Sequence, residues 1–200
     1  MHTIINIGRE FGSGGGFVAK EVGRLLGIDV YDNELISKAA EKSGFSRQLF
    51  ERNDERKSLF SLSSFFSTGR FVQGENYLNS DILFKIQSEV IRSIAESSSA
   101  IFIGRCSDYI LRDMDCLDVF VCGPEEYRVK RVVSLEGLSE EDALSLIRRK
   151  DRTREAYYNY YTFGNWGKAS NYDLCIDSSV LGIEGTAEFI IDFARKKGII

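Results

Sequence analysis

The chain has few of the residues that hold metals or form cross-links. It contains a single histidine, His2, a single proline and four cysteines without any C-x-x-C pair. Because only His2 could add a nitrogen ligand to the thiols, this composition argues against a zinc site and favours reduced cysteines. We therefore predict no metal-ligating residues and a cytoplasmic location. The cysteines are Cys106, Cys116, Cys122 and Cys175.

Long apolar runs and a basic charge balance are also missing. No run approaches the roughly 20 apolar residues that a membrane span needs, and the first residues do not have the pattern of a signal peptide. The formal net charge is −4, which disfavours nonspecific binding to nucleic acid. Between Arg128 and Arg154, however, eight basic residues stand against five acidic ones, an excess that suits a small polyanion. We expect neither a membrane nor a nucleic-acid partner.

Short apolar runs alternate with amphipathic helical stretches along the chain. This alternation is typical of an α/β fold, in which helices cover both faces of a parallel sheet and ligands bind at the carboxyl ends of the strands. We predict one domain over residues 1–200. Strands are predicted at Thr3–Ile7, Asp29–Tyr31, Ala100–Ile103, Leu117–Val121 and Leu174–Ile176. Helices are predicted at Gly16–Leu26, Asn33–Lys42, Asp81–Glu96, Pro124–Leu135, Ser139–Tyr161 and Ile183–Lys197.

One segment, Arg56–Asn79, interrupts the alternation. It is rich in serine and contains no repeat. Loops of this length are often functional or disordered. The segment either covers a substrate or forms a long surface connection, and we treat it as part of an inserted flap.

The glycine-rich stretch Gly8–Gly16 lies between the first strand and the first helix. Glycines allow backbone N–H groups to approach an anion, and the helix N-terminus adds a partial positive charge. The stretch nevertheless departs from the phosphate-loop consensus G-x-x-x-x-G-K-[ST]. When Gly14 is aligned with the second consensus glycine, Gly15 and Gly16 replace the lysine and the hydroxyl residue. The sequence predicts a phosphate-binding loop without its usual cation. The alternative is an ordinary turn, because Gly-Ser-Gly-Gly-Gly is also the composition of flexible linkers.

A basic cluster runs from Arg148 to Arg154. On a helix Arg148 and Arg152 lie one turn apart, and Asp151 neighbours Arg154. Guanidinium groups beside a phosphate site can clamp phosphoryl oxygens, and Asp151 could orient one of them or contact a substrate. The alternative is a basic helix face exposed to solvent.

Two polar residues follow predicted strands at the expected ligand edge. Arg105 follows the apolar run that ends at Gly104, and it is either an anion-binding cation or a surface residue after a capping glycine. Asp32 follows the second strand. It could bind an acceptor hydroxyl or act as a base, although the commoner role is to cap the helix that begins at Asn33.

An aromatic run follows the basic cluster. Because Tyr157 and Tyr161 share a helix face, core packing is the main interpretation. Base stacking or a homodimer contact is the alternative. The run comprises Tyr157, Tyr158, Tyr160, Tyr161, Phe163 and Trp166.

Taken in order, these segments resemble the cytidylate kinase-like family of P-loop proteins, over nearly the whole chain. The matching segments are Ile7–Gly15, Val30–Asp32, Ile103–Cys106, Asp151–Arg154 with Tyr157 and Tyr158, Tyr172–Leu174 and Ile176–Ser178.

The resemblance implies a three-layer α/β/α P-loop fold with a five-stranded parallel sheet. It also implies a monophosphate-binding insert at about residues 33–80 and a helical lid at about residues 145–168. Enzymes of this kind transfer the γ-phosphoryl group of ATP to CMP or dCMP with Mg²⁺. By analogy, Arg105 would face the acceptor phosphate, Asp151 would help to bind the acceptor, and Arg148, Arg152 and Arg154 would belong to the lid. The donor phosphates would be held by Gly12, Ser13, Gly14, Gly15, Gly16 and Phe17.

The sequence departs from cytidylate kinases at several positions. The lysine and hydroxyl of the loop are absent, and Ile103 and Cys106 replace two acids around Gly-Arg. Because phosphoryl transfer depends on positioning and charge neutralisation, another cation must substitute for the lysine. We predict Arg9 in this catalytic role, since its planar fork can bind two phosphate oxygens; Lys20 is the second choice.

Three functions remain open on the sequence. The first is an active kinase of CMP or another small phosphorylated acceptor. The second is a nucleotide-binding sensor without turnover, which the missing lysine favours. The third is a kinase of a non-nucleotide metabolite, which would share the same lid.

Overall fold

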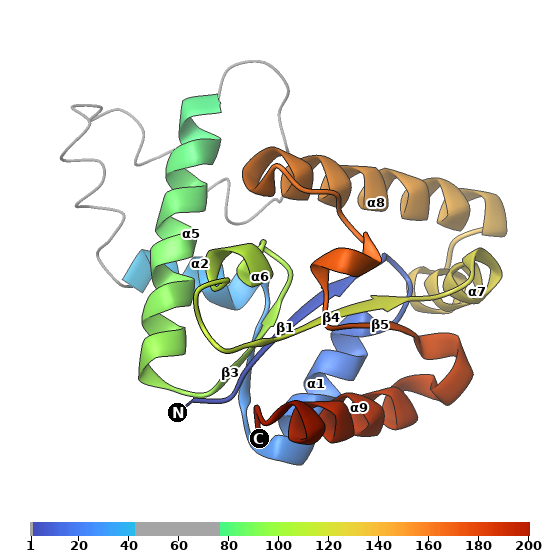
Figure 1. Cartoon of the computed structure of the whole chain (residues 1–200). Helices are drawn as coiled ribbons and strands as arrows, with labels where there is room; N and C mark the ends of the chain where they lie inside the picture. Colours follow the sequence, from blue (N-terminus) through green and yellow to red (C-terminus); the bar gives the residue numbers. More distant parts are fainter. Residues whose placement is uncertain (1, 43–76) are drawn as a thin grey trace.

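The computed structural model describes residues 2–42 and 77–200, so most of the predicted insert lies outside the described residues. Five parallel strands form one sheet in the order β2-β3-β1-β4-β5 (Figure 1). Ile5 at the centre pairs with Ile101 on one side and with Leu117 on the other. The strands are β1 Ile4–Arg9, β2 Asp29–Tyr31, β3 Ala100–Ile103, β4 Leu117–Cys122 and β5 Leu174–Asp177. The predicted five-stranded parallel sheet is confirmed.

The helices agree closely with the sequence pattern. Two short elements, α6 and the 3₁₀ helix η1, were not predicted, and α9 begins five residues earlier than expected with a kink at Gly182, whose φ is 70°. No helix in the described part of the chain is long and apolar enough to cross a membrane. The helices are α1 Gly15–Leu26, α2 Asn33–Lys42, α5 Tyr77–Ser97, α6 Ser107–Ile110, α7 Glu125–Glu136, α8 Glu140–Thr162, η1 Ala169–Asn171 and α9 Ser178–Lys197.

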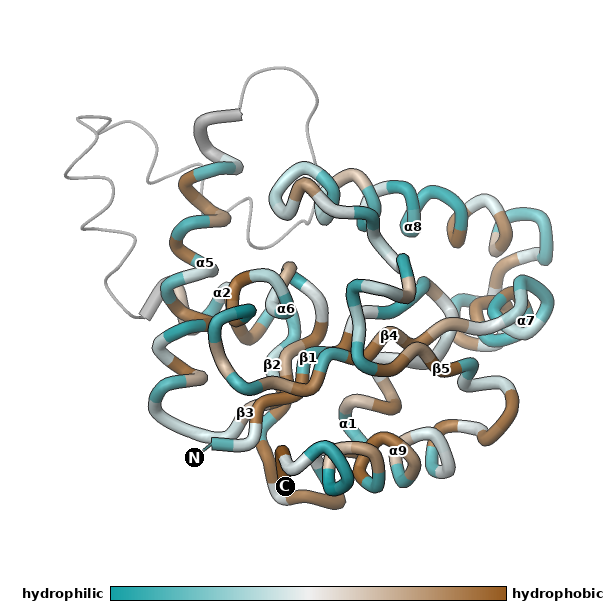
Figure 2. Tube along the Cα trace, in the orientation of Figure 1, coloured by the Kyte–Doolittle hydropathy of each residue, from teal (hydrophilic) through white to brown (hydrophobic). Residues whose placement is uncertain are grey.

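Apolar side chains on both faces of the sheet pack against helices. Below the sheet in Figure 1, α1 and α9 bury residues such as Val22 and Ile190 against Val119. On the other face, α2, α5 and α6 enclose a second cluster that includes Ile86 and Phe102. Figure 2 shows that hydrophobic residues are concentrated on the strands, as expected for a parallel sheet covered on both faces. Helix α8 lies above the sheet, near the carboxyl ends of the strands (Figure 1).

Candidate active site

The phosphate-binding loop joins β1 to α1. Gly12 and Gly14 have φ values of 82° and 83°, which glycine adopts without strain. A Cβ on Gly12 would also lie only 3.0 Å from Cβ of Arg128, so a side chain there would be crowded as well as strained. Helix α1 starts after Gly14 without a side-chain cap and without an acid in its first turn. Its N-terminus therefore keeps its partial positive charge for an anion.

Hydrogen bonds fix the loop from within and from the first residue of α9. Ser13 Oγ donates to the carbonyl oxygen of Glu10 at 2.9 Å and accepts from the N–H of Gly15 at 3.3 Å. The Ser178 hydroxyl donates to the carbonyl oxygen of Ser13. The N–H of Phe17 donates to the carbonyl oxygen of Gly14 at 2.8 Å, inside the first helical turn. The loop is thus a pre-formed structure, and the donor-binding roles of its residues stay predictions.

Arg9 crosses the space that a consensus lysine would need. A Cβ placed on Gly15 would come within 2.6 Å of Cβ of Arg9, and one placed on Gly104 would overlap its guanidinium group. The side chain of Arg9 therefore runs over the lysine position of the loop and ends against the turn after β3. This path places its guanidinium between the phosphate-binding loop and the region around Arg105.

The turn after β3 is conformationally unusual. Gly104, Arg105 and Cys106 are consecutive residues with positive φ, at 68°, 59° and 57°. Left-handed conformations of non-glycine residues are uncommon and cluster at functional sites. The turn brings the guanidinium of Arg105 over the ring of Tyr157, 5.2 Å from its centroid. The predicted role of Arg105 in binding an anion at the ligand edge stays a prediction.

A cavity of about 260 Å³ opens between this turn, the end of β1 and helix α8. Among the described residues, four cationic side chains line it, namely Arg9, Arg105, Lys150 and Arg154. Burial, followed by repulsion from Arg154 and Arg105, lowers the pKa of Arg9 to about 9. Arg9 therefore stays charged at neutral pH, but at an energetic cost that a bound anion would remove. The cavity is suited to phosphate.

Helix α8 is joined to the loop by an acid and an arginine. The Asp151 carboxylate accepts the N–H of Phe11 at 2.7 Å and forms an ion pair with Arg128 at 2.6 Å. Arg154 Nη1 donates to the carbonyl oxygen of Arg9 at 3.1 Å. Asp151 thus holds the predicted lid against the phosphate-binding loop and does not line the cavity. Its predicted contact with the acceptor stays a prediction.

We expect Asp151→Ala to destabilise the protein strongly. Its ion pair with Arg128 is largely buried, with exposed side-chain fractions of 17% for Asp151 and 12% for Arg128. The substitution leaves this guanidinium with Glu10, at 3.6 Å, as its remaining acidic partner. This should cost about 3 kcal/mol and lower Tm by about 6–12 °C. Thermal unfolding followed by circular dichroism measures the effect. The matched control is Asp192→Ala, whose exposed pair with Arg195 should matter by less than about 3 °C. Equal changes in Tm for the two variants would show that Asp151 does not hold α8 against the loop.

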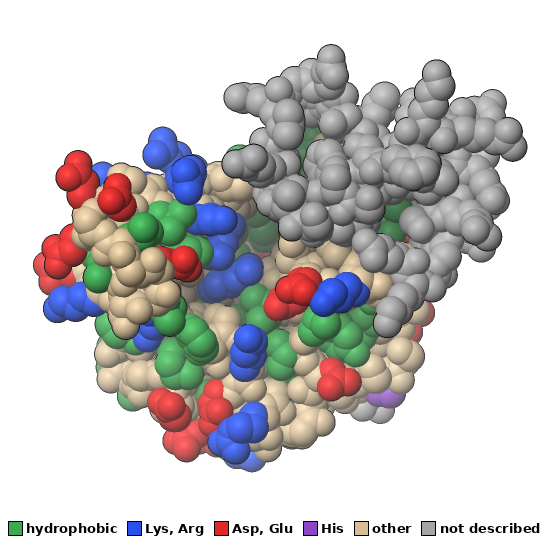
Figure 3. All heavy atoms as spheres, turned by 180° about the vertical axis from the view of Figure 1, so that it is seen from behind, with side chains coloured by type: hydrophobic (Ala, Val, Ile, Leu, Met, Phe, Trp, Pro, Cys, Tyr) green, Lys and Arg blue, Asp and Glu red, His purple; other side chains and the backbone are tan. Residues whose placement is uncertain are grey.

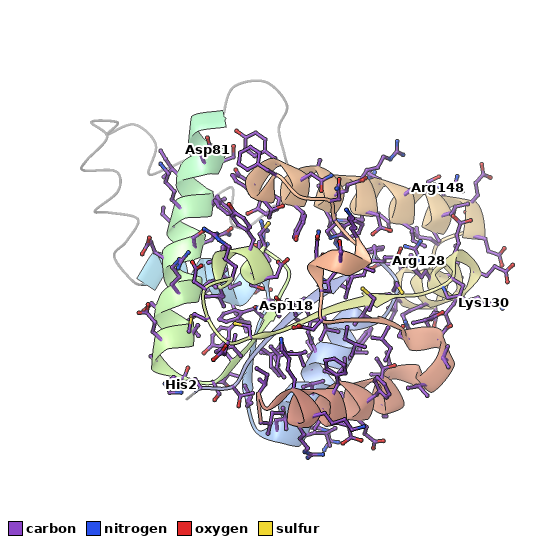
Figure 4. All side chains as sticks on the ribbon, in the orientation of Figure 1. His2, Asp81, Asp118, Arg128, Lys130 and Arg148 are labelled. Carbon is purple, nitrogen blue, oxygen red and sulfur yellow. The ribbon has the colours of Figure 1, made fainter. Side chains whose placement is uncertain are left out.

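The structure separates the predicted arginines into two groups. Arg9, Arg105 and Arg154 meet at the cavity, whereas Arg148 and Arg152 are exposed on α8. Arg148 pairs with Glu125 at 3.3 Å, and Figure 4 shows it on the outer part of the helix. Neither Arg148 nor Arg152 lines the cavity or contacts the loop among the described residues. The lid roles of these two arginines stay predictions.

Asp32 has the capping role that we gave as its alternative. Its Oδ1 accepts the N–H of Leu35 at 3.0 Å, at the start of α2. Its negative charge partly opposes the lowering of the pKa of Arg9. Capping and a role at the site are therefore compatible.

The aromatic run of α8 packs against α5. The ring of Tyr161 stacks on Phe84 with centroids 3.9 Å apart, and Tyr157 meets the same ring edge-on at 6.3 Å. The ring of Trp166 meets that of Phe120 edge-on, with centroids 5.4 Å apart. These contacts agree with core packing for part of the run, while Phe163 is 91% exposed.

Two arginines on α7 were not singled out from the sequence. Arg128 Nη1 donates to the carbonyl oxygen of Phe11 at 3.2 Å, and Arg131 Nη1 donates to that of Gly12 at 3.1 Å. Arg131 also lies over the ring of Tyr127, 4.5 Å from its centroid. Figure 3 shows basic side chains gathered on the α7 and α8 side of the molecule, and Figure 4 places Arg128 between these helices. The sequence signal that could have identified these two arginines was the excess of basic residues that begins at Arg128.

Comparison with protein-family models gives a match to the description "Cytidylate kinase-like family" over residues 4–180. The chain belongs to this family. Among its cytidylate kinase-like relatives, the cytidylate kinase of Pyrobaculum calidifontis is 24% identical over 192 residues, covering 96% of this chain and 92% of that protein. The cytidylate kinase of Sulfolobus acidocaldarius is 26% identical over 116 residues, which span 58% of this chain and 63% of that protein.

Solved structures agree with the family fold. An uncharacterized protein from Eubacterium ventriosum superposes with a TM-score of 0.73 and 30% identity, covering 98% of this chain and 99% of that one. The shikimate kinase of Acinetobacter baumannii, in complex with shikimate, has a TM-score of 0.53 and 11% identity, covering 98% of this chain and 94% of that one. At that identity the second similarity shows the P-loop kinase fold alone.

Proposed function

We propose that this protein is an ATP-dependent phosphotransferase that phosphorylates CMP, dCMP or a related small phosphorylated acceptor. The observation that carries the proposal is the cluster of Arg9, Arg105 and Arg154 in a cavity beside the phosphate-binding loop. Three guanidinium groups that repel one another gain stability from an anionic ligand. Membership of the cytidylate kinase-like family supports nucleotides as donor and acceptor.

In this proposal, different residues bind the donor phosphates, bind the acceptor phosphate and neutralise the transferring group. The N-terminus of α1 and the backbone of the loop bind the donor phosphates, with Arg131 beside them at Gly12. Arg105 and Arg154 hold the phosphate of the acceptor in the cavity. Arg9 lies between the two and neutralises the charge that spreads over the transferring group. Positioning and neutralisation of this kind supply most of the catalysis in phosphoryl transfer.

The described residues do not form an all-protein Mg²⁺ site. The loop has Gly16 where the consensus places a hydroxyl ligand, and no three His, Cys, Asp or Glu side chains in residues 2–42 and 77–200 converge on one point. We therefore assign no ligand to the metal and derive no step through it. In this family Mg²⁺ would enter with ATP, and phosphate oxygens and water are the ligands it commonly keeps.

The second candidate is a sensor that binds nucleotide without turnover. It is favoured by the glycines at positions 15 and 16 and by Asp151, which already occupies the N–H of Phe11 in the loop. A kinase of a non-nucleotide metabolite is the third candidate. The four free cysteines suit a reducing compartment such as the cytoplasm for all three.

A coupled assay of ADP release separates these functions. The protein is incubated with ATP and Mg²⁺ and with each nucleoside monophosphate in turn. We expect ADP release that depends on CMP or dCMP. ATP binding without release in the presence of any monophosphate would contradict the proposal and favour the sensor or the metabolite kinase.

A further inference from the structure

Two polar side chains that the proposed mechanism does not use face each other on the central strands. Asn6 on β1 is the register partner of Asp118 on β4, and its Nδ2 donates to Oδ1 of Asp118 at 2.8 Å. Asn6 is only 2% exposed, and Figure 4 labels Asp118 over the middle of the sheet. Strands covered by helices on both faces are normally apolar. An amide and a carboxylate at this position therefore need a physical explanation.

The amide of Asn6 has one hydrogen-bonding atom left over. Its Oδ1 is buried and has no hydrogen-bond partner among the described residues. The neighbouring thiol of Cys116 does not fill this role, because it donates to the carbonyl oxygen of Leu111. An ionised carboxylate only accepts hydrogen bonds, whereas a protonated one carries an O–H donor. Protonated Asp118 would thus supply the donor that Asn6 Oδ1 lacks.

The surroundings of Asp118 favour its protonated form. Burial raises the pKa of this carboxyl group from the ordinary 3.8 to about 6. The negative charges of Asp108 and Asp173 act in the same direction, while the hydrogen bond from Asn6 and the positive charge of Lys197 oppose them. The folded protein therefore holds a proton on Asp118 at a pH where the unfolded chain would release it.

The charged neighbours of Asp118 have partners of their own. Asp173, just before β5, accepts the N–H of Asp118 at 2.9 Å and forms an ion pair with Lys197 on α9. Asp108 on α6 accepts the hydroxyl of Tyr158 at 2.7 Å and lines the cavity. Among the described residues, the side chain of Asp118 forms no ion pair and accepts only an amide N–H. Asp118 is therefore the carboxylate of this group that gains most from a proton.

We propose that Asp118 and Asn6 form a proton-dependent link between β1 and β4: in mildly acidic solution the folded protein takes up a proton on Asp118, whose O–H then donates to Asn6 Oδ1 while Asn6 Nδ2 still donates to Asp118. The proton comes from the solvent, and no other covalent bond changes. Because the pKa of Asp118 is higher in the folded protein than in the unfolded chain, the stability that this proton adds is fully present below about pH 4 and is lost as the pH rises through about 6. The link is a pH-sensitive switch of stability and does not depend on the proposed function.

Thermal unfolding at two pH values tests the link. Asp118→Asn removes the charge and supplies a permanent N–H for Asn6 Oδ1. We expect its Tm to exceed that of the wild-type protein by about 3–6 °C at pH 8 and by about half as much at pH 5. Asp118→Leu also removes the charge but leaves the amide of Asn6 unpaired, so its Tm should not rise. Asp115→Asn, at an exposed acid of the same segment, is the matched control and should change Tm by less than about 2 °C at either pH.

The titration of Asp118 can also be followed by NMR of the carboxyl carbons in protein with ¹³C-labelled aspartate, so the proposal stays testable if a variant does not fold. We expect the Asp118 resonance, assigned through its backbone, to titrate near pH 6. Titration below about pH 5 would overturn the proposal. So would an Asp118→Asn variant that is no more stable than the wild-type protein at pH 8, or an Asp118→Leu variant that gains as much, because burial alone would then account for the effect.

Discussion

Replacing Arg9 with alanine will lower kcat for phosphoryl transfer at least about 100-fold, the scale on which removal of a single transition-state donor acts. Arg9 is the cation whose side chain runs over Gly15, the lysine position of the loop, and lines the cavity beside the turn after β3. Without it, the charge on the transferring group has no neutralising partner at that point. Steady-state ADP release at saturating ATP and acceptor measures the loss.

We expect the same variant to keep or increase its thermal stability although it loses activity. Burial and the charges of Arg154 and Arg105 lower the pKa of Arg9 to about 9. A lowered pKa means that the charged guanidinium is less stable in the folded protein than in water. Removing Arg9 should therefore leave Tm unchanged or raise it. Arg195→Ala, at an exposed ion pair on α9, is the matched control and should change neither quantity appreciably. A large fall in Tm would show that Arg9 is structural, and full turnover would show that it is not the cation.

Restoring the consensus lysine by Gly15→Lys will inactivate the protein rather than improve it. A Cβ at this position would lie 2.6 Å from Cβ of Arg9 and 3.2 Å from Cβ of Val121. Both neighbours are fixed to strand backbones, so the clash forces the loop to move. Overpacking of this kind costs about 1–3 kcal/mol, and displacement of Arg9 should reduce turnover by about 100-fold. Thermal unfolding and ADP release together measure the two effects.

The neighbouring glycine and Arg9 itself provide the controls. A Cβ on Gly16 would meet no atom within 4 Å, so Gly16→Lys should leave Tm nearly unchanged. Adding Arg9→Gly to Gly15→Lys should recover stability and part of the turnover, because the space over position 15 is then free for the lysine. Full activity of the single Gly15→Lys variant would show that Arg9 does not occupy the space of the lysine.

The sheet and most helices were predictable because their patterns are local. The run Ala100–Ile103 was predicted at its observed bounds, since a strand buried on both faces is a continuous apolar run. Ser139 marked the start of α8, and its hydroxyl indeed accepts the N–H of Asp142 at 3.1 Å. Helix α6 has only four residues, too few for a helical period. The early start of α9 was hidden by Gly182, which interrupts its pattern.

The site was less predictable, because its residues come from separate elements. Spacing showed that Arg148 and Arg152 share a face of α8, but it did not show which face meets the loop. That face carries Asp151 and Arg154. Arg131 and Asp108 had no motif around them, and only the packing of α7 and α6 at the strand ends brings Arg131 to the loop and Asp108 to the cavity.

The most direct test of the central claim, that Arg9 replaces the loop lysine in an active phosphotransferase, is a transfer assay with ATP carrying a radiolabelled γ-phosphate. Wild-type protein and Arg9→Ala are incubated with labelled ATP, Mg²⁺ and CMP, and the nucleotide products are separated. The account predicts labelled CDP with the wild-type protein and about 100-fold slower labelling with the variant. Equal labelling by both proteins, or no transfer to any acceptor by the wild-type protein, would contradict it.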